Sequence, residues 1–334
     1  MRCRSCIKHS LFTVCSGRNE RGFVLYVFKR SSGKISVNNT FFIVAYCSMA
    51  AVDCVRVADK IIQRYMRIVD FHNDAITNLS PKRFLKYIAR AEKAGVQVLL
   101  VSVWTTEMQD PLVQIRRCRQ VIDGINGGVK LLLHIEDAWF VNEGNIDELL
   151  ALRPFSVGLT WNANNNLAGG ALGDGRLTAL GRFVIDRLVA ADIRIDLAHL
   201  NRQSFFEVMP LLKLPFCSHT CFDEVNSHPR NLTRSQIRAI VDSGGVVGLT
   251  LVGDFLRSKG RARMQDVYRH IRYFIAHFGA DNLCIGTDFF GTANLPRGLR
   301  DYRGFRRLRK FLLRQGLSEV CISKIFYVNS YRLL

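Results

Sequence analysis

The sequence lacks a long hydrophobic run and lacks a regular cysteine framework. Although 48% of its residues are hydrophobic, no apolar run approaches the roughly 20 residues that span a bilayer, so we expect a soluble protein without a membrane partner. Of its ten cysteines, five fall in the first 54 residues and five are dispersed through apolar segments. This arrangement excludes a disulfide scaffold and suits a reducing compartment, so we expect a cytoplasmic protein.

Acidic residues are also scarce. The chain has 28 Asp and Glu against 47 Lys and Arg, which gives a net charge of +19. Basic residues concentrate in residues 1–65 and in residues 297–314, where Asp301 is the one acid. The spacing in the second region, three and four residues, is typical of a solvated helix face. No aromatic stacking platform or base-reading motif accompanies it, so we expect no nucleic-acid partner. An acidic or phosphate-rich partner is the alternative.

Residues 1–65 differ in composition from the rest of the chain, because they are basic, cysteine-rich and without a clear period. The cysteine spacing that begins at Cys3 and Cys6 matches no standard zinc finger. Residues 50–65 could form one amphipathic helix. We predict that residues 1–65 are an N-terminal extension, disordered or absent from the native protein, and that Met66 opens the folded domain, residues 66–334. N-terminal sequencing of the native protein tests this start.

From Met66 onward, strand-like and helix-like segments alternate regularly. The expected strands are residues 67–71, 96–103, 130–135, 155–160, 192–197, 214–218, 245–251 and 282–287. The expected helices include residues 81–94, 110–126, 176–191, 202–212, 233–243, 264–278 and 302–315. This is the element count of a (β/α)8 TIM barrel, and a chain of 334 residues is long enough to form one. A doubly wound sheet is the alternative.

Five metal-capable side chains stand at the ends of apolar strand-like runs: His72, Asp74, Glu136, His199 and His219. The i, i+2 spacing of the first two puts them on one face of a strand, where both can reach one ion. Nitrogen and carboxylate ligands of this kind suit zinc. Side chains at the ends of four separate strands converge only if the sheet closes, and this favours the barrel over the open sheet.

Several motifs follow one another in the order seen in a known family. They are Asp70-Phe71-His72-Asn73-Asp74, Ile135-Glu136, Leu159-Thr160-Trp161-Asn162 with Asn166-Leu167-Ala168, Asp196-Leu197-Ala198-His199, Ser218-His219, His228-Pro229-Arg230-Asn231-Leu232-Thr233, Gly244-Gly245-Val246-Val247-Gly248 and Ile285-Gly286-Thr287-Asp288-Phe289. From residue 67 to the end of the chain, the sequence resembles the renal (membrane) dipeptidase family. That family has a (β/α)8 barrel of the metal-dependent hydrolase type, so residues 66–334 would be a dipeptidase domain.

The resemblance implies a zinc-dependent dipeptidase with two zinc ions per chain and dipeptides as substrates. His72 and Asp74 would hold one zinc, His199 and His219 the other, and Glu136 would bridge the two. A hydroxide between the metals would attack the peptide carbonyl. The resemblance also implies that Asp288 moves the proton and lies near the substrate amine, and that Arg230 binds the substrate carboxylate. A homodimer is left open.

The chain also departs from the family pattern. Trp161 stands where many members carry a histidine that contacts the substrate, and we include it among the substrate-binding residues. We expect His134 to be structural, and His270 and His277, on a predicted helix, to lie on the surface. Two other functions compete with the dipeptidase. One is a different binuclear amidohydrolase activity, on a lactone, a phosphoester or an N-acyl amino acid, and the other is a catalytically inactive metal-binding barrel.

Overall fold

The computed structural model describes residues 5–8, 12–19, 22–29 and 66–334 of the 334-residue chain. Two units are distinguished, Met1–Met66 and Arg67–Leu334. The first contains an antiparallel sheet of three strands in the order β1-β2-β3, namely β1 (Ser5–Lys8), β2 (Phe12–Asn19) and β3 (Gly22–Lys29). Cys3 and the amphipathic helix expected over residues 50–65 lie outside the described residues. The origin of residues 1–65 stays a prediction.

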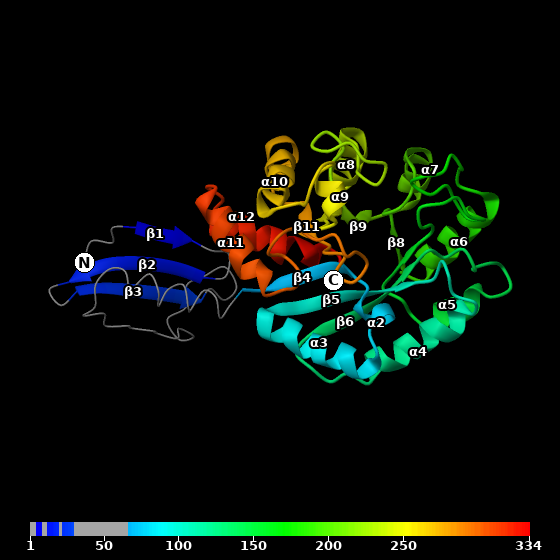
Figure 1. Cartoon of the computed structure of the whole chain (residues 1–334), viewed down its shortest axis with the longest axis horizontal. Helices are drawn as coiled ribbons and strands as arrows, with labels where there is room; N and C mark the ends of the chain where they lie inside the picture. Colours follow the sequence, from blue (N-terminus) through cyan, green and yellow to red (C-terminus); the bar gives the residue numbers. More distant parts are fainter. Residues whose placement is uncertain (1–4, 9–11, 20–21, 30–65) are drawn as a thin grey trace. The chain divides into compact units, whose positions relative to one another are not determined.

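The second unit is a closed barrel of parallel strands, as predicted (Figure 1). The strands are β4 (Ile68–Asn73), β5 (Val96–Trp104), β6 (Lys130–Glu136), β7 (Ser156–Gly158), β8 (Arg194–Asp196), β9 (Phe216–Thr220), β10 (Val246–Leu249) and β11 (Leu283–Ile285). Each strand pairs in parallel with the next along the chain, and β11 closes the ring by pairing with β4. The doubly wound alternative is therefore wrong. In a closed parallel barrel all carboxyl ends of the strands open on the same side.

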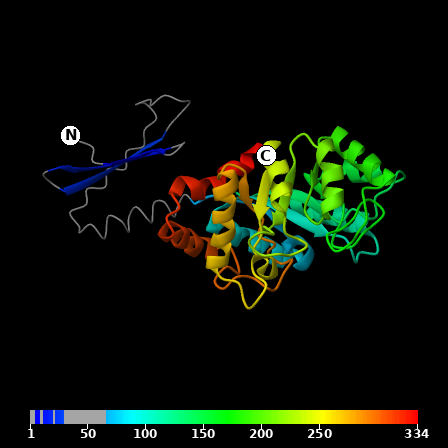
Figure 2. The ribbon, with the colours of Figure 1, turned by 90° about the horizontal axis from the view of Figure 1, so that it is seen from above.

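Helices connect the strands and surround them (Figures 1 and 2). They are α2 (Ala75–Asn78), α3 (Pro81–Ala94), α4 (Pro111–Asp123), α5 (Ile146–Ala151), α6 (Ala179–Ala190), α7 (Arg202–Val208), α8 (Arg234–Asp242), α9 (Gly253–Leu256), α10 (Met264–Phe278), α11 (Gly304–Arg314) and α12 (Glu319–Phe326), with 3-10 turns η2 (Met209–Leu211) and η3 (Val328–Arg332). The seven helices expected from the sequence are all found. The helix expected over residues 202–212 changes to the 3-10 turn η2 at Met209, next to Pro210, which lacks a donor for a regular helix.

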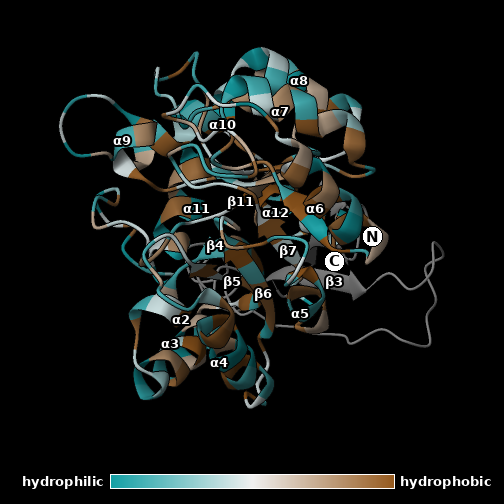
Figure 3. Ribbon diagram, turned by 90° about the vertical axis from the view of Figure 1, so that its right-hand side faces the viewer, coloured by the Kyte–Doolittle hydropathy of each residue, from teal (hydrophilic) through white to brown (hydrophobic). Residues whose placement is uncertain are grey.

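The helix boundaries follow from local sequence signals. Helix α3 has Pro81 in its first turn and ends at Gly95, whose φ of 102° is in the left-handed region that glycine tolerates. Helix α8 begins with a capping box between Thr233 and Gln236, which satisfies two free backbone donors. Figure 3 shows hydrophobic residues gathered on β5 and β6, whereas α3, α4, α7 and α8 alternate hydrophobic and hydrophilic positions. This alternation fits helices with one face on the barrel.

Part of the barrel interior is filled by apolar side chains. The cluster contains Val69, Phe71, Val98, Leu100, Phe216, Val246, Cys284, Tyr327 and Leu333. Its members come from β4, β5, β9, β10 and β11 and from the C-terminal segment, so they pack across the barrel and not along one sheet. Phe71 and Phe216, from the non-adjacent strands β4 and β9, have ring centroids 6.1 Å apart. This packing fixes the strands whose ends carry the polar residues described below.

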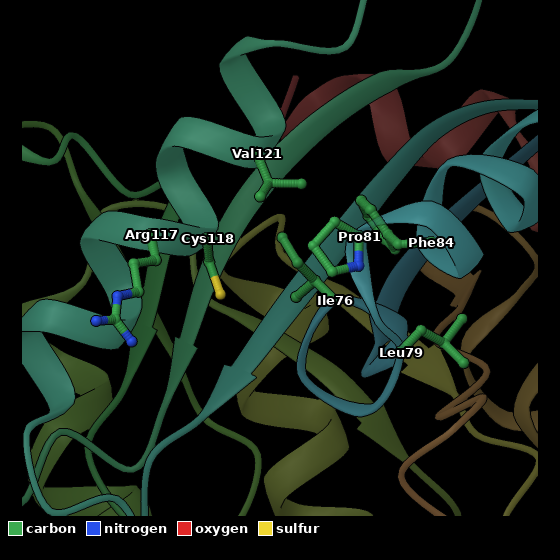
Figure 4. A pocket seen from close by; sticks show the side chains of 7 residues that line it. All are labelled: Ile76, Leu79, Pro81, Phe84, Arg117, Cys118 and Val121. Atoms are coloured by element: carbon green, nitrogen blue, oxygen red, sulfur yellow. The ribbon is translucent and has the colours of Figure 1, made fainter.

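Among the described residues, no helix is long and apolar enough to cross a membrane. A small apolar pocket lies between α2, α3 and α4, and Figure 4 shows its side chains converging from these helices. Its lining is Ile76, Leu79, Pro81, Phe84, Arg117, Cys118 and Val121. None of these residues belongs to the polar cluster at the carboxyl ends of the strands, so the pocket is separate from it.

Candidate metal centre

The five metal-capable residues predicted from the sequence come together at the carboxyl ends of the strands. His72 lies in β4, Glu136 ends β6 and His219 lies in β9. Asp74 directly follows β4, and His199 follows β8 by three residues. All five residues are buried, and none is more than 6% exposed. The distances below show that they form one compact group.

Glu136 lies between two pairs of residues, His72 with Asp74 and His199 with His219. Its Oε2 lies 3.5 Å from Nε2 of His72, which in turn lies 3.4 Å from Oδ2 of Asp74. Its Oε1 lies 2.7 Å from Nε2 of His199 and 3.9 Å from Nε2 of His219. The two nitrogens of His199 and His219 are 3.0 Å apart. The carboxylate of Glu136 thus presents Oε2 to His72, the partner of Asp74, and Oε1 to His199 and His219.

The donor atoms fit divalent cations. Nε2 of His72 and Oδ2 of Asp74 are buried and have no hydrogen-bond partner among the described residues. Buried polar atoms without a partner are rare in proteins and point to a bound ion or water. His72, Glu136 and His219 form one group whose ligand atoms all lie within 4.8 Å of one another, and His72, Asp74 and Asp288 form a second. Imidazole nitrogens and carboxylate oxygens together are the ligand set of zinc.

Burial and neighbouring charges set the protonation of the group. Burial lowers the pKa of His199 to about 4, with a further contribution from Arg230. Burial also holds the pKa of His219 well below its usual value. Burial alone would lower the pKa of His72, but the carboxylates of Asp74 and Glu136 raise it well above the usual value. His199 and His219 are therefore neutral near pH 7, which is the form that binds a metal.

Two polar side chains orient the histidines, and the sequence did not single out either for this role. Oδ1 of Asn162 lies 3.0 Å from Nδ1 of His199, so the ring places its proton on Nδ1 and leaves Nε2 free as an acceptor. Oγ of Ser218 lies 2.7 Å from Nδ1 of His219 and 3.5 Å from Nδ1 of His72. Outer contacts of this kind fix the tautomer of a ligating histidine.

Replacing Asn162 with alanine is expected to weaken zinc binding by about 10-fold to 100-fold, because His199 loses the contact that fixes its tautomer. Competition with a zinc-sensitive chelating dye measures the affinity. Asn166→Ala, at an exposed position four residues on, is the matched control and should keep the affinity of the unmodified chain. If both variants bind zinc with equal affinity, Asn162 does not contribute to zinc binding.

Asp288 lies on the β4 side of the group. Its Oδ1 is 3.9 Å from Nε2 of His72, and its backbone N–H donates to the carbonyl of His72 at 3.0 Å. Its φ of 59° lies in the left-handed region, as does that of His199 at 67°. Such backbone strain in non-glycine residues is concentrated at functional sites. Burial, and next the carboxylate of Asp74, raise the pKa of Asp288 well above its ordinary value.

Glycine is required beside Asp288. A Cβ added at Gly291 would fall against the carboxylate oxygens of Asp288 and Asp74. The loop that follows β11 therefore passes directly over these two carboxylates, and a larger residue would push one of them away. This contact helps to hold Asp288 next to the first donor pair.

Arg230 lies on the opposite side, next to the second donor pair. It follows β9 in the loop before α8 and is 5% exposed. Its Nη2 lies 2.9 Å from Nε2 of His219, and its guanidinium carbon stands 5.4 Å from the ring centroid of Phe255. Its Nε is buried without a hydrogen-bond partner among the described residues. One donor of the guanidinium fork thus remains free for an anionic group.

Trp161 follows β7 and is half-buried beside the histidines. Its ring centroid lies 6.3 Å from that of His199 and 5.4 Å from that of Trp104. All eight sequence-predicted site residues therefore lie at the same end of the barrel. The assignment of a role to each of them remains a proposal.

Three further histidines test the predictions made from the sequence. His134 is buried, with its Nδ1 2.8 Å from Oγ of Ser156 and its Nε2 3.5 Å from Oδ2 of Asp196. Because His134, His72 and Asp196 also form a group that could hold a metal, the structural role of His134 stays a prediction. His277 is exposed, as expected. The surface position expected for His270 is wrong, because it is completely buried. Its Nδ1 accepts from the backbone N–H of Phe222 at 3.2 Å and its Nε2 lies 3.2 Å from the carbonyl of Leu256, so the ring connects α10 to the loop after β9 and to the end of α9.

A closed (β/α)8 barrel with clustered histidines and carboxylates at its carboxyl-terminal mouth defines the class of metal-dependent barrel hydrolases. The family described as Membrane dipeptidase (Peptidase family M19) matches residues 96–334, more than half of the chain. The chain belongs to this family, and it is a metallo-dipeptidase.

Individual relatives agree with this placement. An uncharacterized protein from the pqqA 5' region of Klebsiella pneumoniae is 33% identical over 235 residues, which cover 66% of this chain and 84% of that protein. An uncharacterized dipeptidase of Schizosaccharomyces pombe is 29% identical, over 59% of this chain and 55% of that protein. This chain thus spans only about half the length of the yeast relative.

A solved structure shows the same fold. It is a metallo peptidase from Rhodobacter sphaeroides liganded with a phosphinate mimic of the dipeptide L-Ala-D-Ala. Its TM-score with this chain is 0.70 at 21% identity, and the match covers 80% of this chain and 98% of that one.

Proposed function

We propose that this chain is a zinc-dependent dipeptidase that binds two zinc ions. His72 and Asp74 would hold one ion and His199 and His219 the other, with Glu136 shared between them. The observation that carries this proposal is the placement of Glu136, whose Oε2 faces the first pair and whose Oε1 faces the second. Bound zinc supplies a Lewis acid that makes water nucleophilic near neutral pH and polarises the substrate carbonyl.

The remaining chemistry belongs to side chains of the protein. Asp288 stands next to the first donor pair, where its carboxylate can accept the proton of the attacking water and return it to the leaving amine. Being an acid, it also suits the free amino group of a short substrate. Its position, 3.9 Å from His72, is within reach of a proton relay through one water molecule.

Arg230 supplies the preference for dipeptides. Its guanidinium lies beside His219, and a buried cation with an unpaired donor is suited to the terminal carboxylate of a substrate. A carboxylate bound there would lie one residue from the scissile bond, and together with Asp288 near the free amino group this spacing favours dipeptides. The phosphinate dipeptide mimic bound by the Rhodobacter sphaeroides structure supports the same substrate class for this chain.

Replacing Arg230 with alanine is expected to raise KM for free dipeptides by about tenfold or more, because a charge-assisted hydrogen bond to the carboxylate is lost. Steady-state kinetics on a dipeptide and its C-terminal amide measure the effect. The amide should respond far less, since it carries no carboxylate. Arg230→Lys keeps the charge but not the fork and should give an intermediate KM. An equal rise in KM for the dipeptide and for its amide would show that Arg230 does not bind the substrate carboxylate.

We also propose a cytoplasmic location, supported by the state of the described cysteines. Cys118, Cys217, Cys221, Cys284 and Cys321 are all free thiols. Free thiols without disulfides among them suit a reducing compartment.

The experiment that tests the proposed function is removal of metal. Dialysis against a strong chelator should abolish release of free amino acids from dipeptides, and addition of zinc should restore it. Activity that survives complete loss of metal would contradict the proposal.

A further inference from the structure

All three tryptophans of the chain stand at the carboxyl ends of three consecutive barrel strands. Trp104 is the last residue of β5, Trp139 follows β6 by three residues, and Trp161 follows β7 by three residues. Because parallel strands end on the same side of a barrel, the three indoles belong to the mouth that holds the candidate metal centre.

Trp161 lies nearest to the reacting groups. Its ring plane is inclined by only 31° to that of His199, at a centroid distance of 6.3 Å. Trp104 packs edge-on against it, at 5.4 Å and 60°. A ring supported edge-on by a second indole has little freedom to turn, so Trp161 presents a fixed apolar surface beside His199.

Trp104 adds an independent sign that a ligand belongs there. Its Nε1–H is buried and has no acceptor among residues 66–334, the part of the chain whose side chains the structure describes. Trp139 differs, since its Nε1–H donates to the carbonyl of Thr105 at 3.2 Å. A buried indole donor normally has a partner, so the Trp104 N–H is available to an acceptor atom of a ligand.

We propose that Trp161, backed by Trp104, forms a subsite for an aromatic side chain of the dipeptide. The inference rests on the proposed function and names its preferred substrates, dipeptides that contain Phe, Tyr or Trp. Aromatic rings stack offset on an indole face and bury a large area there. An imidazole at position 161 would offer a hydrogen bond to the substrate. The indole of Trp161 offers an apolar contact at this position.

A cationic side chain is the competing occupant, because a cation can also bind an indole face. Near His199 the charges oppose one another, since the guanidinium of Arg230 lies 2.9 Å from His219 and the carboxylate of Glu136 lies 2.7 Å from Nε2 of His199. Dipeptides that contain Lys or Arg are therefore compared with aromatic ones in the test below.

The first test is the ratio of kcat/KM for Phe-containing dipeptides to that for Ala-Ala, with phenylalanine at either position. We expect a ratio of about ten or more in the unmodified chain for at least one position. Trp161→Ala should bring the ratio close to one, whereas Trp161→Phe should retain most of it. Trp139→Phe is the control, because that ring packs on Phe140 at 6.2 Å, and it should keep the ratio.

The second test does not depend on turnover. Since the sequence has no tryptophan outside this mouth, intrinsic fluorescence reports on it directly. A phosphinate analogue of a Phe-containing dipeptide should quench the emission of the zinc-loaded chain, and it should bind at least about tenfold more weakly to Trp161→Ala. For an Ala-Ala phosphinate, Trp161→Ala should lose less affinity than it loses for the Phe-containing analogue.

The outcomes separate this inference from the proposed function. If dipeptides are cleaved with no preference for aromatic residues, or with a preference for Lys or Arg, the subsite is overturned while the dipeptidase stands. If no dipeptide is cleaved but the aromatic analogue binds in a manner that depends on Trp161, the proposed function fails and the subsite stands.

Discussion

Replacement of Glu136 by glutamine is expected to remove activity almost completely and to reduce the zinc content from about two ions per chain to one or none. The change keeps the size of the side chain but removes the charge that faces both donor pairs, His72 on one side and His199 on the other. Loss of metal assistance costs several kcal/mol of transition-state stabilisation, which corresponds to at least about a thousandfold in rate. Elemental analysis and dipeptide hydrolysis measure the two effects.

The barrel should remain folded in this variant, because Glu136 lies at the mouth and not in the apolar cluster of the interior. Circular dichroism checks the fold. Glu143→Gln, an exposed position in the loop after the same strand, is the matched control and should keep both zinc and activity. A Glu136→Gln protein that retains two zinc ions and full activity would contradict the assignment, and one that unfolds would make Glu136 a structural residue.

Replacement of Asp288 by asparagine is expected to lower kcat by about 10²-fold to 10⁴-fold, the range typical for loss of a general acid–base group. Asparagine tolerates the left-handed backbone of this position, where φ is 59°, so the main change is loss of the proton acceptor. Steady-state kinetics and zinc analysis on the same preparation measure the effect. Zinc content should stay at about two.

Asp281→Asn is the control for this change, since Asp281 is exposed and pairs with Lys324 at the surface. It should leave kcat unaltered. If Asp288→Asn loses zinc along with activity, Asp288 is a metal ligand, as its place in a group with His72 and Asp74 allows. If kcat is unchanged, the proton acceptor must be another group.

The barrel itself follows from local sequence patterns. Each of the eight strands overlaps one of the expected strands, because strands buried on both faces are largely apolar and the sequence shows these apolar runs. The long amphipathic helices, such as α3 and α10, carry an apolar stripe that the sequence displays directly. The short helices α5 and α9, of six and four residues, have too few turns to show a period.

The candidate metal ligands could be found because each stands at the end of a predicted strand, and closure of the barrel brings such ends together. The contacts that orient them could not be found in this way. Asn162 contacts His199 across 37 positions of sequence, and His270 in α10 contacts Phe222 in the loop after β9 and Leu256 at the end of α9. Contacts between distant segments depend on side-chain packing, which no local pattern records.

The indole surface beside His199 is a second case in which the sequence shows a residue but not its contacts. The sequence shows that a tryptophan stands at position 161, but it does not show that Trp104, 57 positions earlier, supports it. The pairing arises because β5 and β7 both neighbour β6 in the barrel. Only the fold reveals that the three tryptophans share one region.

The measurement that tests the central claim most directly is zinc content by elemental analysis of the full chain, combined with release of free amino acids from a library of L,L and L,D dipeptides. The account predicts about two zinc ions per chain and cleavage, both lost on chelation and both restored by zinc. A chain that cleaves dipeptides without bound metal, or that binds no zinc at all, would contradict it.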